Sequence, residues 1–206
     1  MNNEKTWDEK LNIHTIGRDA SHEDSAHHPY EPTPYSVLER LAKSGVITSA
    51  DHVVDYGSGK GRAAIFLHDR TGCRVTGIEY YPAFVQEAED NLKSYGRTET
   101  VRFVQADASE YLPEENQNIF FFFNPFPETI LRAVLHRILE SYYAMPRQIT
   151  LLFCYPSDDY IGLLMTVPEI DFNDEIDIGD LFRKKDSRER IMIFTIGSEG
   201  AYRDEQ

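Results

Sequence analysis

The chain has 206 residues, of which 41% are hydrophobic and 27% are charged. This length and composition suit about one folded domain and exclude collagen-like, coiled-coil and wholly disordered chains. The longest apolar runs, such as residues 119–123, are far shorter than the roughly 20 residues that a membrane helix needs. Residues 1–24 show no basic and apolar segments of a secretory signal. We therefore expect a cytoplasmic protein with no membrane partner.

The charge is strongly acidic, with 21 Lys and Arg against 35 Asp and Glu, a net charge of −14. A surface of that sign repels phosphate backbones, so the composition disfavours nucleic acid as a partner. The basic run at residues 183–190 is interpreted as a solvated loop. The cysteines Cys73 and Cys154 and the irregularly spaced histidines indicate neither a disulfide framework nor a metal site.

Polar residues dominate the first 28 positions, which carry four of the seven histidines and predict a flexible arm. Residues 29–206 are predicted to form one domain, in which strand-like and helix-like segments alternate. Thr33 is expected to cap a helix that starts at Pro34 and stops at Gly45. Later helices are expected over 62–69, 82–95, 128–143 and 158–165, and strands over 52–56, 74–79, 101–105, 118–123, 148–154, 167–178 and 190–196. This order predicts a three-layer α/β/α fold that ends in an antiparallel hairpin.

A glycine-rich loop, Val-Val-Asp-Tyr-Gly-Ser-Gly-Lys-Gly-Arg at residues 53–62, follows the first predicted strand. Gly57, Gly59 and Gly61 allow a sharp turn and a close approach of the backbone to a ligand. Open α/β sheets bind their ligands at this end of the strands. Arg62 stands where a dinucleotide-binding loop has its third glycine, and no Ser or Thr follows Gly-Lys as a P-loop requires. The loop is therefore of another kind.

With Asp55 two residues before its first glycine, this loop resembles motif I of the class I S-adenosylmethionine-dependent methyltransferases. Further matches stand at the next strand ends: Glu79, Asp107 and the turn Asn124-Pro125-Phe126-Pro127. The resemblance covers roughly residues 30–156. It implies a Rossmann-like sandwich with a mostly parallel seven-stranded sheet, S-adenosyl-L-methionine as cofactor, and a methyltransferase activity.

The resemblance also implies roles for individual residues. Glu79 is expected to accept hydrogen bonds from the ribose hydroxyls, and Asp107 from the adenine amino group. Asp55 is expected to hold the loop or to meet the ammonium of the methionine portion. The candidate cofactor-binding residues are Asp55, Gly57, Ser58, Gly59, Gly61, Glu79, Tyr80, Asp107, Ala108 and Asn124.

The candidate catalytic residues are Asn124, Pro125, Phe126 and Tyr30. Carbonyl oxygens of Asn124 and Pro125 can orient an amine, and the ring of Phe126 can cover a planar or cationic group. The turn is similar to the (Asp/Asn)-Pro-Pro-(Tyr/Phe) motif of methyltransferases that act on amino or amide nitrogens. Phe126 replaces the second proline, which argues against an adenine nitrogen as acceptor.

Two flanking segments complete the expected pocket. Tyr30 and Thr33 belong to a Tyr-x-Pro-Thr element similar to one that precedes the loop in some protein-lysine methyltransferases, and it is interpreted as a lid. Tyr155 and Pro156 are expected to form another wall. The leading hypothesis is a methyltransferase whose acceptor is a nitrogen of a protein side chain or small molecule. The alternatives are a non-catalytic module that binds S-adenosylmethionine or S-adenosylhomocysteine, and an NAD-dependent oxidoreductase.

Overall fold

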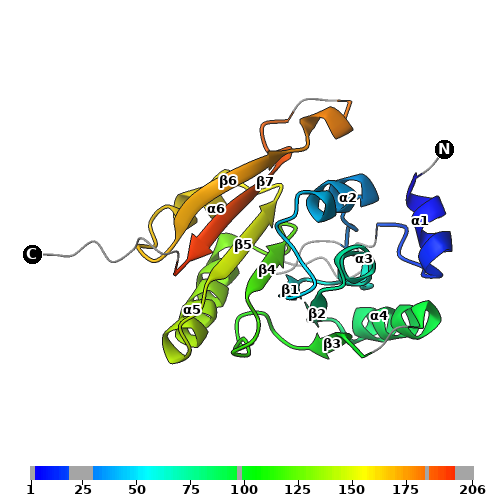
Figure 1. The fold of residues 1–206 in the computed structure, drawn as a ribbon, viewed down its shortest axis with the longest axis horizontal. Coiled ribbons are helices and arrows are strands. Elements are labelled where there is room, and N and C mark those ends of the chain that lie inside the picture. Colours follow the sequence, from blue (N-terminus) through cyan, green and yellow to red (C-terminus); the bar gives the residue numbers. More distant parts are fainter. Residues whose placement is uncertain (1–2, 19–29, 97–98, 184–185, 198–206) are drawn as a thin grey trace, which may run out of the picture.

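The computed structural model describes residues 3–18, 30–96, 99–183 and 186–197, and its centre is a seven-stranded sheet (Figure 1). The order of the strands is β3-β2-β1-β4-β5-β7-β6. β1 to β5 are parallel, and β7 runs antiparallel between β5 and β6. The strands are β1 (His52–Tyr56), β2 (Arg74–Glu79), β3 (Val101–Gln105), β4 (Ile119–Phe122), β5 (Ile149–Cys154), β6 (Asp171–Asp177) and β7 (Arg190–Ile196). The predicted sheet with a final antiparallel hairpin is confirmed.

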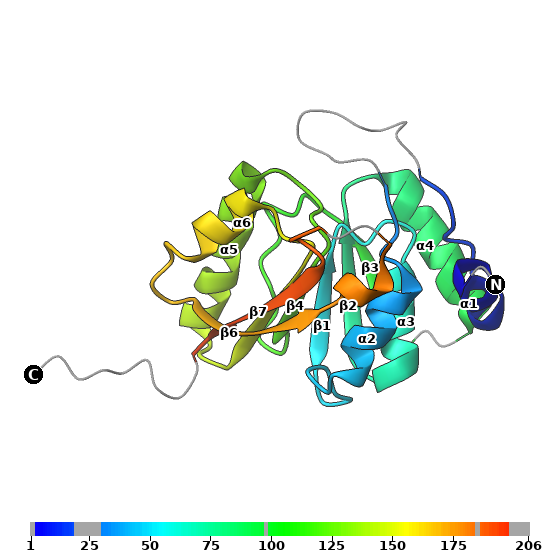
Figure 2. The same ribbon diagram turned by 90° about the horizontal axis from the view of Figure 1, so that it is seen from above.

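Helices cover both faces of the sheet (Figure 2). They are α1 (Asn3–Leu11), α2 (Tyr35–Lys43), α3 (Arg62–Thr71), α4 (Pro82–Tyr95), α5 (Glu128–Ala144), α6 (Asp158–Leu164) and the short 3-10 helix η1 (Gly179–Leu181). The first four pack on one face and α5 and α6 on the other, which leaves β1 and β4 buried on both sides. Double burial explains why these strands are apolar without alternation. Within the described residues, no helix is long and apolar enough to cross a bilayer.

Two predicted boundaries are wrong for local reasons. Thr33 does not cap α2: Pro34 occupies the N-cap, and the Tyr35 N–H donates to the Glu4 carboxylate at 3.2 Å. The strand predicted from residue 167 begins only at Asp171, because residues 167–170 form a hydrogen-bonded turn that contains a proline.

The amino-terminal segment is ordered where the sequence predicted a flexible arm. Residues 3–11 form α1, and Leu11 and Ile13 are buried with 3% and 1% of their surfaces exposed. The Trp7 ring lies 5.9 Å from that of Tyr35 and 4.9 Å, edge-on, from that of Phe66. The prediction of a flexible arm is therefore wrong for residues 3–18. The remaining residues of the predicted arm, 1–2 and 19–28, lie outside the described residues.

A buried polar cluster holds α1 against the start of α3. Asp8, 4% exposed, accepts hydrogen bonds from the Thr15 N–H at 2.6 Å, the Thr15 hydroxyl at 2.7 Å and the Tyr35 hydroxyl at 2.6 Å. Arg62, 3% exposed, pairs with Glu4 and donates from Nε to the Thr15 hydroxyl at 2.7 Å. Polar partners therefore fix a helix that has few apolar residues, which is why hydrophobic periodicity does not predict it.

We expect Asp8→Ala to lower the free energy of unfolding by about 2–4 kcal/mol, because it leaves buried donors and the Arg62 charge with fewer partners. Urea denaturation followed by circular dichroism measures the change. Glu9→Ala on the same helix removes only an exposed ion pair with Lys5 and is the matched control. Equal stabilities for the two variants would show that α1 does not depend on the cluster.

Candidate functional site

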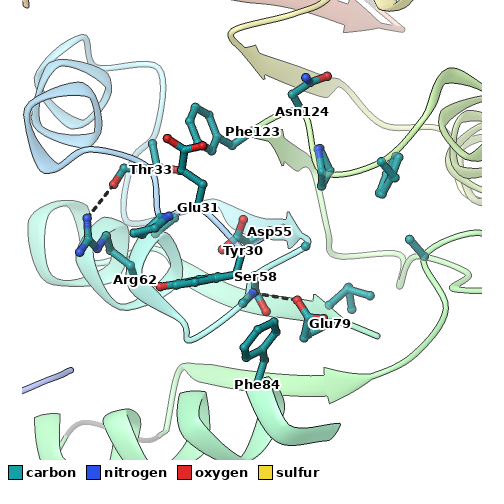
Figure 3. Close-up of a pocket in the computed structure, with 18 of the residues that line it drawn as sticks. Tyr30, Glu31, Thr33, Asp55, Ser58, Arg62, Glu79, Phe84, Phe123 and Asn124 are labelled. Atoms are coloured by element: carbon teal, nitrogen blue, oxygen red, sulfur yellow. Dashed lines mark hydrogen bonds between the residues drawn. The ribbon is translucent and has the colours of Figure 1, made fainter. Parts of the chain in front are cut away.

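A cavity of about 640 Å³ lies at the carboxyl ends of the parallel strands (Figure 3). This is the edge at which open α/β sheets bind ligands. Every residue predicted for the site except Gly61 and Pro156 contributes to its wall. The predicted residues that line it are Tyr30, Thr33, Asp55, Gly57, Ser58, Gly59, Glu79, Tyr80, Asp107, Ala108, Asn124, Pro125, Phe126 and Tyr155.

The glycine loop passes between two side chains that leave no space for a Cβ atom. A Cβ on Gly57 would lie 2.6 Å from Cβ of Pro125, and one on Gly59 would lie 2.4 Å from the Tyr30 ring. Both glycines have positive φ, +73° and +51°. The Gly57 and Ser58 N–H groups donate to the Ile78 carbonyl at 2.9 and 3.0 Å. Only glycine allows this close packing, which brings the loop backbone to the cavity wall.

Gly61 has a different position from the one that the sequence predicted. It is the N-cap of α3, with φ +84°, and a Cβ there would lie 2.5 Å from the ring of Phe103. It therefore packs the start of α3 against β3 and does not line the cavity, and its role in cofactor binding stays a prediction.

Glu79 ties the glycine loop to the end of β2. Its carboxylate is 7% exposed and accepts from the Gly59 N–H at 2.9 Å and from the Tyr81 N–H at 2.9 Å (Figure 3). Asp107, at the end of β3, is exposed and accepts through Oδ1 from the N–H and hydroxyl of Ser109, at 2.8 and 2.6 Å. Both carboxylates are thus held in fixed orientations on the cavity wall.

Asp55 and Ser58 place unsatisfied polar atoms at the cavity. Asp55 is 3% exposed and Ser58 7% exposed, and neither Asp55 Oδ2 nor Ser58 Oγ has a hydrogen-bond partner among the described residues. Burial, together with the negative charge of Glu79, raises the pKa of Asp55 to about 7. Buried polar atoms are nearly always paired, so two such atoms on one cavity wall indicate a ligand that completes them.

Strained backbone marks the ends of two adjacent strands. Asn124, after β4, has φ +44°, and Tyr155, after β5, has φ +55°. Non-glycine residues in the left-handed region are uncommon and gather at functional sites. Asn124 lines the cavity, and its side chain makes no hydrogen bond to another described residue. It is therefore available to a ligand.

Phe126 contributes more to the core than the sequence predicted. Its side chain is 5% exposed, and its ring packs edge-on against Tyr56 and Phe122 at centroid distances of 6.5 and 6.3 Å. Its carbonyl oxygen accepts from the buried Tyr160 hydroxyl. The ring therefore has little surface left to cover an acceptor, and the residue chiefly anchors the turn after β4.

Tyr30 positions the glycine loop. Its hydroxyl donates to the Thr15 carbonyl at 2.7 Å, and its ring lies 5.3 Å from that of Phe84. Burial raises the pKa of Tyr30 well above its ordinary value. The hydroxyl thus stays protonated and bonded to the amino-terminal segment. The structure shows that the Tyr30 ring packs against Gly59, and the catalytic role of Tyr30 stays a prediction.

Several cavity residues are defining residues of none of the motifs that the sequence shows. Phe123 and Phe182 contribute aromatic rings, and Glu31 and Arg188 contribute charges. Glu31 is the variable residue of the Tyr-x-Pro-Thr element, and its place next to Tyr30 is the signal in the sequence that points to it. Phe182 and Arg188 lie beyond the strand–helix repeat, and only the tertiary fold brings them to the cavity.

Comparison with known sequences agrees with this geometry. Residues 53–144 match a family model described as a methyltransferase domain. The trans-aconitate 2-methyltransferase of Escherichia coli O157:H7 is 29% identical over 107 residues, 52% of this chain and 36% of that protein. The release factor glutamine methyltransferase of Chlorobaculum tepidum is 42% identical over 74 residues, 34% of this chain and 25% of that protein. The chain thus spans about a third or less of these relatives' lengths.

Solved structures share the fold. An RNA methyltransferase from Salinibacter ruber, in complex with S-adenosyl-L-homocysteine, has a TM-score of 0.56 and 22% identity over 82% of this chain and 95% of that one. An S-adenosylmethionine-dependent O-methyltransferase from Thermotoga maritima has a TM-score of 0.59 and 18% identity over 81% and 66%. At these identities the likeness establishes a Rossmann-like architecture.

The raised pKa of Asp55 predicts how its substitution depends on pH. Between the unfolded value of 3.8 and the folded value of about 7, the folded state binds more protons than the unfolded state. The contribution of Asp55 to the free energy of unfolding therefore falls as pH rises through this interval. We expect Asp55→Asn to gain stability relative to the wild type as pH increases, and the difference to level off above about pH 7.

Urea denaturation of both proteins at intervals from about pH 5 to about pH 8 measures this difference. Asp107→Asn, which removes an exposed carboxylate from the same wall, is the matched control for the loss of a charge there. Parallel stability curves for Asp55→Asn and the wild type would contradict the raised pKa.

Proposed function

We propose that this protein is a class I S-adenosylmethionine-dependent methyltransferase, which binds S-adenosyl-L-methionine along the glycine loop and transfers its methyl group to an acceptor nitrogen. The observation that carries the proposal is the pair of unpartnered buried atoms, Asp55 Oδ2 and Ser58 Oγ, under a glycine loop. The acceptor class is inferred from the turn after β4.

The chemistry of the cavity residues fits this cofactor. Asp55 offers negative charge to an ammonium or sulfonium group, and Ser58 offers a hydroxyl beside it. Glu79 and Asp107 present oxygen acceptors suited to ribose hydroxyls and an amino group. A volume of about 640 Å³ is within the range of pockets that enclose molecules of this size. Tyr80, Ala108 and the loop glycines are assigned to the same contacts.

The chain's contribution to methyl transfer is positioning. The sulfonium of S-adenosylmethionine supplies an already activated methyl group, so the protein has to orient the acceptor and exclude water. Pro125 packs against Gly57 and fixes the strained backbone of Asn124. The side-chain and backbone carbonyl oxygens of Asn124 are acceptors that orient an N–H group of the substrate. The lone pair of the substrate nitrogen then faces the methyl group.

We expect Glu79→Ala to weaken S-adenosylhomocysteine binding by about 1.5–3 kcal/mol, or roughly 10- to 150-fold in Kd, because charge-assisted hydrogen bonds to the sugar and the support of Gly59 are lost. Isothermal titration calorimetry measures the change. Glu89→Ala removes an exposed acid of α4 and is the control. Unchanged affinity in Glu79→Ala would contradict the assigned role.

Labelled S-adenosylmethionine tests catalysis. Lysate incubated with the protein and then separated into protein, nucleic acid and metabolites should carry label in the protein or metabolite fraction. We expect Asn124→Ala to lower the rate of methyl transfer by about tenfold or more, because acceptor orientation is lost.

The fractions also separate the alternatives. Label confined to nucleic acid would contradict the acceptor assignment. Binding of S-adenosylhomocysteine without transfer to any fraction would favour a non-catalytic binding module, and tight binding of NADH in place of S-adenosylhomocysteine would favour an oxidoreductase.

A further inference from the structure

The cavity has two chemically different ends (Figure 3). Glu79 and Phe84 lie at one end, while Glu31 and Phe123 lie at the other, beyond Asp55. We propose that the second end is a subsite for an aliphatic primary amine, recognised as its ammonium ion by an aromatic wall and by Glu31. The proposal rests on the proposed function and specifies the substrate class of the same site.

The aromatic wall consists of Phe123, Tyr155 and Phe182, which all line the cavity. The Phe123 and Tyr155 centroids are 5.9 Å apart with planes at 86°, and those of Tyr155 and Phe182 are 5.5 Å apart at 83°. The three residues follow β4, β5 and η1, so separate elements converge on one wall. Aromatic faces attract alkylammonium groups and pack against their methylene chains.

Tyr155 keeps this wall uncharged. Burial, followed by the negative charge of Glu189, raises the pKa of Tyr155 above its ordinary value. Its hydroxyl makes no hydrogen bond to another residue in the described part of the chain. An uncharged phenol with a free hydroxyl is suited to contact a ligand, and Glu31 is then the residue that pairs with the charge of the cation.

The charges on the cavity wall favour a cation. Its acids are Glu31, Asp55, Glu79 and Asp107, and its basic residues are Arg18, Arg62 and Arg188. Arg62 is buried against Glu4 and Asp8, and Arg188 pairs with Asp186 at 2.7 Å, which leaves the exposed Arg18. Glu31 is exposed and forms no ion pair with another described residue, and the chain carries a net charge of −14. An anionic acceptor meets repulsion here, whereas an ammonium is attracted.

The reaction of this acceptor is balanced without a further reactant. The bound ammonium first releases one proton to water. The amine nitrogen then forms a bond to the methyl carbon while the carbon–sulfur bond breaks, and that electron pair stays on sulfur to give the neutral thioether. The nitrogen gains the positive charge that sulfur loses, and the product leaves as a methylammonium.

A pair of tethered ligands tests the subsite by binding alone. In one analogue of S-adenosylmethionine, a 4-aminobutyl chain replaces the transferred methyl group, and in the other an n-pentyl chain of equal length replaces it. We expect the wild type to bind the aminobutyl analogue about tenfold more tightly than the pentyl analogue, because the cation gains both Glu31 and the aromatic faces.

Substitutions assign the preference to residues. Glu31→Gln should reduce the ratio of the two Kd values to about threefold or less, and Phe182→Leu should weaken the aminobutyl analogue alone, both with S-adenosylhomocysteine affinity unchanged. Glu115→Gln is the matched control, since Glu115 is exposed in the turn before β4, at the opposite edge of the sheet. The ratio of the two Kd values for Glu115→Gln should equal that of the wild type.

The outcomes are distinct from a failure of the proposed function. If S-adenosylhomocysteine itself does not bind, the proposed function is wrong. If it binds but the pentyl analogue binds as tightly as the aminobutyl analogue, or Glu31→Gln keeps the preference, the amine subsite is wrong. Methyl transfer to a lysine-containing peptide or to a linear polyamine identifies the source of the amine, and transfer solely to trans-aconitate or RNA overturns the proposal.

Discussion

The constraint on which the site depends is the absence of side chains at Gly57 and Gly59. The loop backbone passes between Pro125 and the Tyr30 ring at distances that no Cβ atom could tolerate. Hydrogen bonds from the loop N–H groups to the Ile78 carbonyl and to the Glu79 carboxylate fix the same backbone. Contacts to the amino-terminal segment, to β2 and to the turn after β4 therefore meet at one loop, and a change in any of them alters the cavity.

The amino-terminal helix belongs to the same arrangement. Tyr30 covers Gly59, its hydroxyl is held by the Thr15 carbonyl, and Thr15 is itself held by Asp8 and Arg62. Arg62 is the first residue of α3, directly after the loop. A buried ion cluster contributes little net stability compared with apolar packing, but it specifies one geometry. Here the specified geometry is the position of the ring that closes over the glycine loop.

The sequence predicts the sheet and the cavity because both follow from repetition. Parallel strands bring their carboxyl ends to one edge, so Asp55, Glu79, Asp107 and Asn124 converge once the strands are recognised. What the sequence does not predict is held by interactions that leave no periodic pattern. Helix α1 depends on polar partners far along the chain, and Phe182 reaches the cavity through a connection outside the strand–helix repeat.

Roles were harder to predict than positions, for the same reason. Phe126 and Tyr30 are at the cavity as expected, yet the packing of the Phe126 ring in the core and the hydrogen bond from Tyr30 to Thr15 determine what each side chain can do. A motif gives a residue's place on the backbone, whereas its partners decide its exposure and protonation.

The two ends of the cavity differ in origin as well as in chemistry. The end near Glu79 is built from residues at strand ends and in a loop whose backbone shape is demanded by close packing. The other end includes side chains from outside that loop: Glu31 is the variable position of its element, and Phe182 follows a 3-10 turn. Substitution there changes charge and aromatic surface without disturbing the loop. Under the proposed function, this end binds the acceptor, so the acceptor that is recognised can change while the loop keeps its shape.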